Sequence, residues 1–257
     1  MKNYYKYTFL LLAFVLFLGA CKKDFLTEAP KDNIYADNLL VDYDGFQTII
    51  SALQGMMRHE YRRVDAFGGV QSLPFSEQTM FSVGADNAWS NNTHNQFKFM
   101  YYPKYIDQTD LDCFRVTFDW LYKMINTANL VISRAENPGI NWSGGSKEEI
   151  LAQARFYRAW AYRHLTLSFG AVPLITQEVT GSNYRTDWER NPLPETRKVM
   201  EEDLLFTIDN LPMRTANNTM VSGAVARHYL GELYLAENQA QKAKEILKPL
   251  VEGNEYG

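Results

Sequence analysis

The sequence predicts a mostly α-helical solenoid of packed helix pairs, interrupted by one long irregular region. Apolar residues recur at the three- and four-residue spacing of a helix in several successive segments. Capping residues precede some of these segments, and glycine or proline follows them. Aromatic residues make up 14% of the 257 residues, so the chain is long enough and apolar enough to bury one good-sized core.

The clearest helix is expected over residues 147–169. Ser146 is placed to cap the first turn, and Glu149 follows three residues later, as a capping box requires. Gly170 is expected to end the helix in the left-handed conformation, and Pro173 prevents its continuation. A single apolar stripe predicts one buried face, made of Ile150, Ala154, Tyr157, Ala161 and Leu165.

Five further helices are expected from the same kind of periodicity. A break at Asn137-Pro138-Gly139 ends one of them, and Pro212 ends another. An irregular, proline-containing loop is expected from Val172 to Pro194. The five helices cover residues 43–62, 114–135, 196–211, 222–236 and 239–252.

The last two of these helices match the tetratricopeptide repeat pattern, with leucine in place of its final phenylalanine. They are expected to pack antiparallel, with Ala243 against Gly231 and Tyr234, because glycine permits the close approach of two helices. The matching residues are Leu230, Gly231, Tyr234, Ala243 and Leu247.

Residues 65–109 show no sustained periodicity and are rich in glycine, asparagine, serine and aromatic residues. Long irregular segments inside a domain are usually functional or disordered, and the aromatic content favours order. Trp89 lies among short polar side chains, and an aromatic face beside amides and carboxylates suits neutral sugars. The candidate ligand contacts are therefore Asp86, Asn87, Trp89 and Asn92, with burial of Trp89 in the core as the alternative.

The N-terminus predicts a secretory leader over residues 1–20. Lys2 and Lys6 precede an apolar run from Thr8 to Leu18, which is too short to span a bilayer as a helix. Leu18-Gly19-Ala20-Cys21 resembles the bacterial lipobox, which implies that Cys21 is lipidated, with palmitate or a similar acyl chain, and anchors the protein in a membrane. An ordinary signal peptide with an incidental cysteine is the alternative. Cys113 then has no partner, so no disulfide framework is expected.

Charge and motifs argue against several classes of function. The formal net charge is −4, and loss of the two lysines in residues 1–20 makes it −6, which argues against nucleic acid as a partner. No catalytic, metal-binding or cofactor motif is recognisable, so the chain is expected to be no enzyme and to need no cofactor. Arg155, Arg158 and Arg163 either clamp a ligand carboxylate or hold the helices together, and the second role is favoured.

The helix over 147–169 also carries a family resemblance. Arg155 to Tyr162, followed by Phe169-Gly170-Ala171-Val172-Pro173-Leu174-Ile175, resembles the signature of the SusD/RagB family, with mild departures at Tyr157 and at Arg163-His164. Cys21 with the following Asp24-Phe25-Leu26 is similar to how family members begin. The family consists of outer-membrane lipoproteins of Bacteroidetes, built on tetratricopeptide-type helix pairs.

The resemblance implies a cell-surface lipoprotein that binds nutrient oligomers, glycans or peptides, and passes them to a TonB-dependent SusC-like transporter. Family members are substantially longer than this chain, so residues 21–257 are expected to be the N-terminal helical domain, with the C-terminal half of the family absent. Two alternatives remain open. One is a helical scaffold that contacts the transporter without binding ligand, and the other is a lipid-anchored glycoside hydrolase.

Overall fold

The computed structural model describes residues 36–60, 112–216 and 220–253. The chain divides into two compact units, Met1–Asn38 and Leu39–Gly257, and the short helix α2 (Ala36–Leu39) lies at their boundary. The second unit contains the helices α3 (Tyr43–Met57), η2 (Arg58–Glu60), α6 (Asp112–Arg134), α7 (Lys147–Phe169), α8 (Leu193–Asn210), α9 (Gly223–Ala236) and α10 (Ala240–Glu252). None of the helices in these described ranges is both long enough and apolar enough to cross a membrane.

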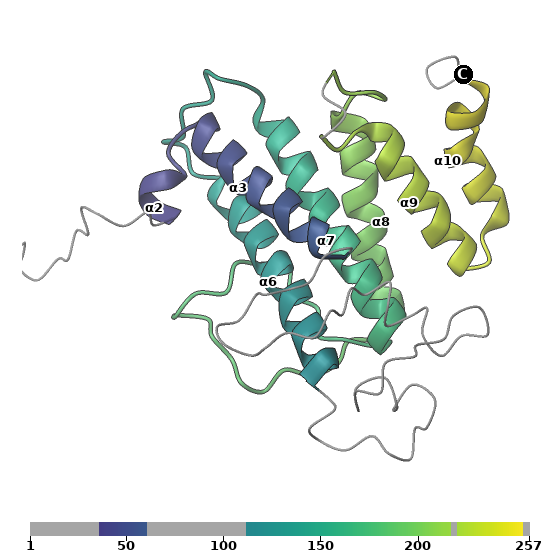
Figure 1. The fold of residues 1–257 in the computed structure, drawn as a ribbon, viewed down its shortest axis with the longest axis horizontal. Helices are drawn as coiled ribbons and strands as arrows, with labels where there is room; N and C mark the ends of the chain where they lie inside the picture. Colours follow the sequence, from purple (N-terminus) through teal and green to yellow (C-terminus); the bar gives the residue numbers. More distant parts are fainter. Residues whose placement is uncertain (1–35, 61–111, 217–219, 254–257) are drawn as a thin grey trace, which may run out of the picture. The chain divides into compact units, whose positions relative to one another are not determined.

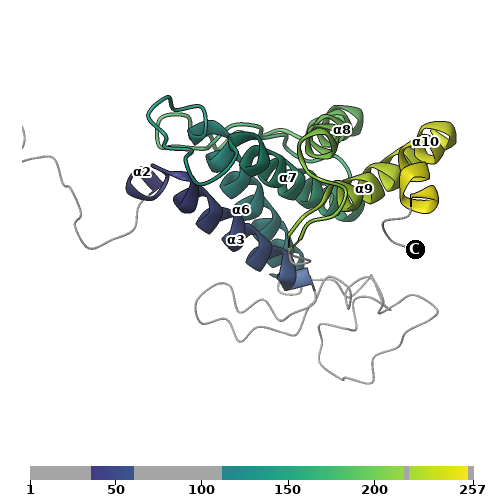
Figure 2. The same cartoon turned by 90° about the horizontal axis from the view of Figure 1, so that it is seen from above.

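The helices of the second unit pack in chain order. Helix α6 contacts α7, α7 contacts α8, α8 contacts α9 and α9 contacts α10, while α3 crosses α6 and α7 (Figure 1; Figure 2 from above). The described residues contain no β-strand, only an isolated bridge between Asp42 and Asn141. The predicted mostly α-helical architecture of packed helix pairs is confirmed.

Helix α7 is the centre of the core. Its bounds and the cap by Ser146 agree with the sequence prediction, since the Ser146 hydroxyl accepts a hydrogen bond from the Glu149 amide. The prediction of a single buried stripe is wrong. Ala152, Phe156 and Trp160 lie on other faces of the helix and are as buried as Ile150, because α3, α6 and α8 enclose α7 from several sides.

The chain leaves α7 through Gly170 in a conformation that differs from the predicted one. Gly170 has φ +70° and ψ −127°, so φ is positive as expected, but ψ excludes the left-handed helical conformation. Only glycine adopts this backbone geometry without strain. The turn sends the chain back along the side of α6 rather than into a further helical turn (Figure 1).

The other helix predictions hold, with changes at some ends. The helix predicted over 43–62 ends at Met57 as an α-helix and continues as the 3₁₀ turn η2. Helix α8 begins at Leu193, earlier than predicted, because Pro194 in its first turn loses no intrahelical hydrogen bond. The loop between α7 and α8 is irregular, as predicted.

Helices α9 and α10 lie side by side and run antiparallel, as predicted (Figure 1). Gly231 allows their close approach, because a Cβ atom at this position would lie 2.7 Å from the side chain of Leu247. The residue that the structure places against Gly231 is thus Leu247. Ala243 is buried at 2% exposure, and the Tyr234 carbonyl accepts a hydrogen bond from the amide of Gln239 in the connecting turn.

Two glycines of α3 allow a matched test of how closely this helix packs against the backbone at Leu39. A Cβ atom at Gly45 would overlap the carbonyl oxygen of Leu39, whereas Gly55 has open space around it. We expect Gly45→Ala to lower the free energy of unfolding by about 1–3 kcal/mol, because the backbone around Leu39 must shift. Gly55→Ala should raise it by about 0.5 kcal/mol, because alanine favours the helix. Urea denaturation of both variants measures the difference. Equal effects of the two substitutions would contradict the packing at Gly45.

Candidate functional site

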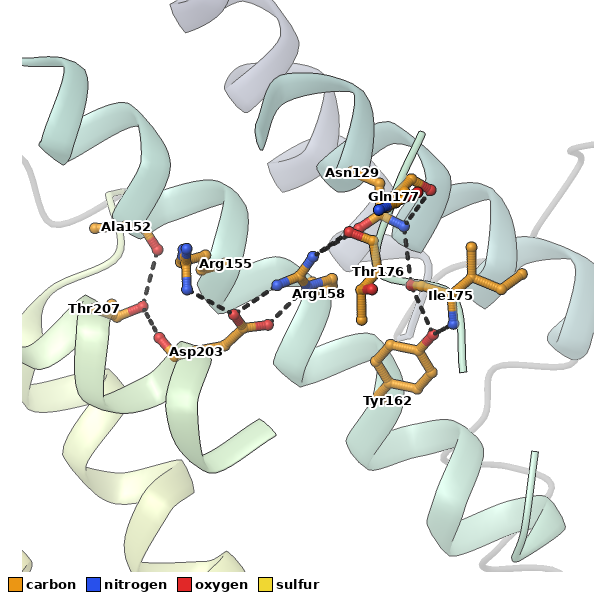
Figure 3. Close-up of polar contacts among 10 residues, drawn as sticks. All are labelled: Asn129, Ala152, Arg155, Arg158, Tyr162, Ile175, Thr176, Gln177, Asp203 and Thr207. Carbon is orange, nitrogen blue, oxygen red and sulfur yellow. Dashed lines mark hydrogen bonds and ion pairs between the residues drawn. The ribbon is translucent and has the colours of Figure 1, made fainter. Parts of the chain in front are cut away.

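The five residues to which the sequence analysis gave a functional role lie outside the described residues. They are the lipidation candidate Cys21 and the ligand-contact candidates Asp86, Asn87, Trp89 and Asn92. Their roles therefore stay predictions. The structure instead brings together a polar network at the centre of the helices and a loop that this network holds in place (Figure 3).

The loop begins with an extended segment, residues 173–179, that lies along α6. Four side chains on one face of α6 bind its backbone, and they recur at the helical spacing i, i+4, i+7 and i+11. From Pro173 to Glu178 the segment follows this face from Tyr122 to Ser133, and it turns back at Val179, whose amide binds Asn126. The backbone of the segment is therefore bonded to one helix face, formed by Tyr122, Asn126, Asn129 and Ser133.

Individual contacts show how completely the segment is bound. The Tyr122 hydroxyl donates to the Pro173 carbonyl oxygen at 2.6 Å. The side-chain amide of Asn129 donates to the backbone carbonyl oxygens of Ile175 and Gln177 at 3.0 and 3.1 Å. At the far end of the segment, Arg134 forms an ion pair with Glu178 at 2.9 Å.

Helix α7 binds the same segment from its other side. The Tyr162 hydroxyl accepts from the Ile175 amide at 2.7 Å and donates to the Ile175 carbonyl oxygen at 3.0 Å. Burial raises the pKa of Tyr162 well above its usual range, so the hydroxyl keeps the proton that it donates. Arg158 donates to the Thr176 carbonyl oxygen at 3.1 Å.

Arg158 is the hub of the network. Its guanidinium donates to both carboxylate oxygens of Asp203 on α8, at 2.7 and 2.8 Å, and to the Asn129 side-chain oxygen on α6 at 2.8 Å (Figure 3). Arg155 adds a longer contact to Asp203 at 3.4 Å. One buried side chain of α7 thus joins α6, α8 and the extended segment.

The charges of this network compensate one another. Asp203 is 1% exposed, and burial raises the pKa of its carboxyl while Arg158 and Arg155 oppose that rise. Burial also works against the charge of Arg158, but the bond to Asp203 holds its pKa above the ordinary value. Two short, parallel N–H···O contacts are the geometry of a guanidinium and an ionised carboxylate. We therefore assign both groups as charged.

Neighbouring contacts extend the network into α8. The Thr207 hydroxyl donates to the backbone carbonyls of Asp203 and Ala152, which fixes α8 against α7 one turn beyond the ion pair. Asn191 closes the base of the loop, since its side chain accepts from the Leu174 amide and its own amide donates to the Val172 carbonyl. The loop is therefore held at both of its ends.

This network has a structural role. Its arginines bind protein groups, so the predicted role of holding the helices together is confirmed for Arg158 and Arg155, and Arg163 forms an ion pair with Glu232 on α9 at 2.8 Å. Within the described ranges, no group of histidine, cysteine, aspartate or glutamate side chains is arranged to hold a metal ion.

Asn129, Tyr162 and Asp203 are not among the residues for which the sequence predicts a role. The spacing of Tyr122, Asn126, Asn129 and Ser133 places them on one face of an amphipathic helix. The solvent-exposed face of any amphipathic helix has the same polar pattern, so the sequence alone does not show that a loop lies along it. Trp120 and Trp160 are buried in the core, at 4% and 1% exposure.

The buried ion pair gives a clear expectation for stability. Asp203→Asn should lower the free energy of unfolding by about 3–5 kcal/mol, because Arg158 is left buried without a compensating charge. Asp209→Asn is the matched control on α8, since Asp209 is exposed, and its effect should stay within about 0.5 kcal/mol. Urea denaturation of the two variants measures the difference. A loss below about 1 kcal/mol for Asp203→Asn would contradict the assigned charges.

Comparison with known proteins gives a consistent result. A SusD-like family model, described as starch-binding and associating with the outer membrane, matches residues 24–235. SusD-like protein P2 of Formosa agariphila is 33% identical over 124 residues, which cover 48% of this chain and 24% of that protein. A SusD-like protein of Bacteroides ovatus is 26% identical over 233 residues, which cover 87% of this chain and 38% of that protein.

Solved structures agree on the fold. A laminarin-binding SusD-like protein superposes with a TM-score of 0.69 at 19% identity, over 81% of this chain and 43% of its own. The chain thus spans between about a quarter and two fifths of the length of the curated relatives that it matches. Since the family model covers most of the sequence and every residue of the Arg158 network, the chain belongs to the SusD-like family.

Proposed function

We propose that the protein is a cell-surface lipoprotein that binds glycan oligomers and delivers them to a TonB-dependent SusC-like transporter in the outer membrane. The observation that carries the proposal is the family match over residues 24–235, whose description combines starch binding with association with the outer membrane. The fold adds support, because a solved neighbour with the same helical arrangement is named as laminarin-binding. Glycans are accordingly favoured over peptides as the ligand.

The described helices supply a rigid scaffold for this function. Asp203 is the one buried carboxylate among the described residues, and two arginines already bind it. A carboxylate held in this way cannot act as a free general acid or as a nucleophile. The family description and the laminarin-binding neighbour support binding without turnover, in preference to a lipid-anchored glycoside hydrolase.

Ligand contact is assigned to the segment that contains Asp86, Asn87, Trp89 and Asn92. The indole of Trp89 offers an apolar face for the C–H groups of a sugar ring, and the neighbouring side chains offer hydrogen bonds to its hydroxyls. Cys21 is assigned as the lipidated residue that anchors the protein to the membrane. Its lipobox-like context supports this role.

Substitution of Trp89 tests the ligand site. Trp89→Ala should weaken oligosaccharide binding about tenfold, because a stacked sugar ring contributes about 1–2 kcal/mol through the apolar area it covers. The melting temperature should stay nearly unchanged, since the proposed platform faces solvent. Isothermal titration calorimetry with laminarin and starch oligosaccharides measures the affinity, and differential scanning calorimetry measures the stability.

Two results would contradict the assignment. Unchanged affinity in Trp89→Ala would remove the residue from the ligand site, and a large fall in melting temperature would return it to the core. Release of shortened sugars by the wild-type protein would favour the glycoside hydrolase. If no glycan binds while the protein still associates with the transporter, the scaffold alternative is correct.

The membrane anchor has a separate test. Cys21→Ser should leave the leader uncleaved or release the protein from the membrane, because the acyl chains on the cysteine are lost. Each buried methylene of an acyl chain contributes about 0.8 kcal/mol to anchoring, so loss of the chains has a large effect. Cell fractionation and gel mobility distinguish the two forms. Identical behaviour of wild type and variant would contradict lipidation at Cys21.

A further inference from the structure

The exposed aromatic side chains of the described residues are concentrated in one loop. Trp188 is 38% exposed and Tyr184 is 69% exposed, and both belong to the loop between α7 and α8. The other large exposed apolar side chains in the described ranges are aliphatic and lie outside this loop. The remaining described tryptophans are packed, with Trp120 and Trp160 in the core and Trp142 against Phe46 at 4.9 Å.

The part of the loop that carries these rings starts from a fixed position. Glu178 is paired with Arg134, and its carbonyl oxygen accepts from the Asn183 side-chain amide at 2.8 Å. The side-chain oxygen of Asn183 accepts in turn from the Thr180 amide at 2.6 Å, which closes a tight turn just before Tyr184. Hydrogen bonds therefore fix the turn that precedes Tyr184 and Trp188.

Trp188 is also held from one side. The Arg185 guanidinium lies over its ring at 5.2 Å, and Asp187 binds that guanidinium at 3.0 Å. A cation over one face of an indole favours one orientation of the ring. The exposed part of the side chain is then available on the remaining face and edges.

The polar groups around the ring are of the kind that binds sugar hydroxyls. Arg185 and Asp187 keep 56% and 78% of their side chains exposed, so both present free hydrogen-bonding capacity beside the ring. A guanidinium and a carboxylate can each bond two neighbouring hydroxyls of a sugar. Without a ligand to bind, a large aromatic ring in a loop is expected to pack against the protein, because exposure of its apolar area to water is unfavourable.

We propose that Trp188 and Tyr184, with Arg185 and Asp187, form an additional carbohydrate-binding subsite for neutral oligosaccharides on the loop between α7 and α8. The proposal rests on the glycan-binding function proposed above and adds a second contact for a long chain. Trp188 supplies an apolar face for a sugar ring, and the Arg185 guanidinium lies over the opposite face of the indole. Asp187 accepts hydrogen bonds from sugar hydroxyls at the edge of the indole. A chain that also reaches this subsite binds more tightly than one that does not.

The test combines an affinity and a direct spectroscopic signal on the full-length chain. Trp188→Ala should weaken binding of laminarihexaose or maltohexaose about three- to tenfold, and Trp188→Phe should keep most of the affinity because an aromatic face remains. Leu167→Ala is the control, since Leu167 is an exposed apolar residue at the end of α7 and outside the loop. The indole N–H signals in ¹⁵N NMR spectra report which tryptophans the sugar contacts.

The outcomes separate this inference from the function on which it rests. A Trp188 indole signal that shifts on addition of the hexasaccharide, together with weaker binding by Trp188→Ala alone, supports the subsite. If the Trp89 signal shifts and the Trp188 signal does not, the subsite is wrong and the glycan-binding function stands. If neither hexasaccharide binds the wild-type protein and no indole signal shifts, the glycan-binding function itself is overturned, and the subsite with it.

Discussion

The buried ion pair between Arg158 and Asp203 is the interaction on which the described helices depend. It joins α7 to α8, and the same guanidinium reaches Asn129 of α6 and the Thr176 carbonyl of the following segment. A charge pair taken out of water is costly unless its geometry is good and its remaining hydrogen-bonding groups are satisfied. Here Arg155 donates a further hydrogen bond to Asp203, and the Asn129 side chain accepts one from Arg158. We therefore expect the pair to specify which helices meet and in what register, more than to add net stability.

The extended segment along α6 is the consequence that matters for function. Irregular backbone near a core needs hydrogen-bond partners, and side chains of α6 and α7 provide them in place of a β-strand. The segment in turn fixes where the exposed loop begins.

Much of the helical architecture could be predicted from the sequence, because caps, stops and apolar periodicity are local signals. The bounds of α7 and the pairing of α9 with α10 follow from Ser146, Gly231 and Leu247 in this way.

The other features of the fold depend on contacts between residues that lie far apart in the sequence. The burial of α7 on several faces reflects the positions of α3, α6 and α8, and its own sequence shows only the apolar stripe. The pairing of Arg158 with Asp203 joins residues far apart in the chain, and nothing local distinguishes Asp203 from a surface carboxylate. The ligand candidates around Trp89 rest on composition alone.

Native-state hydrogen exchange at the Ile175 amide tests the central claim most directly. This amide donates to the Tyr162 hydroxyl at 2.7 Å, next to the carbonyl that Arg158 binds, and it belongs to no helix or strand. If the network holds the segment as part of the core, the opening free energy of this amide should lie within about 1 kcal/mol of that for the amide of Leu165 in α7. Exchange at the rate of an exposed loop amide such as that of Ser182 would show that the segment opens independently, and would contradict the account.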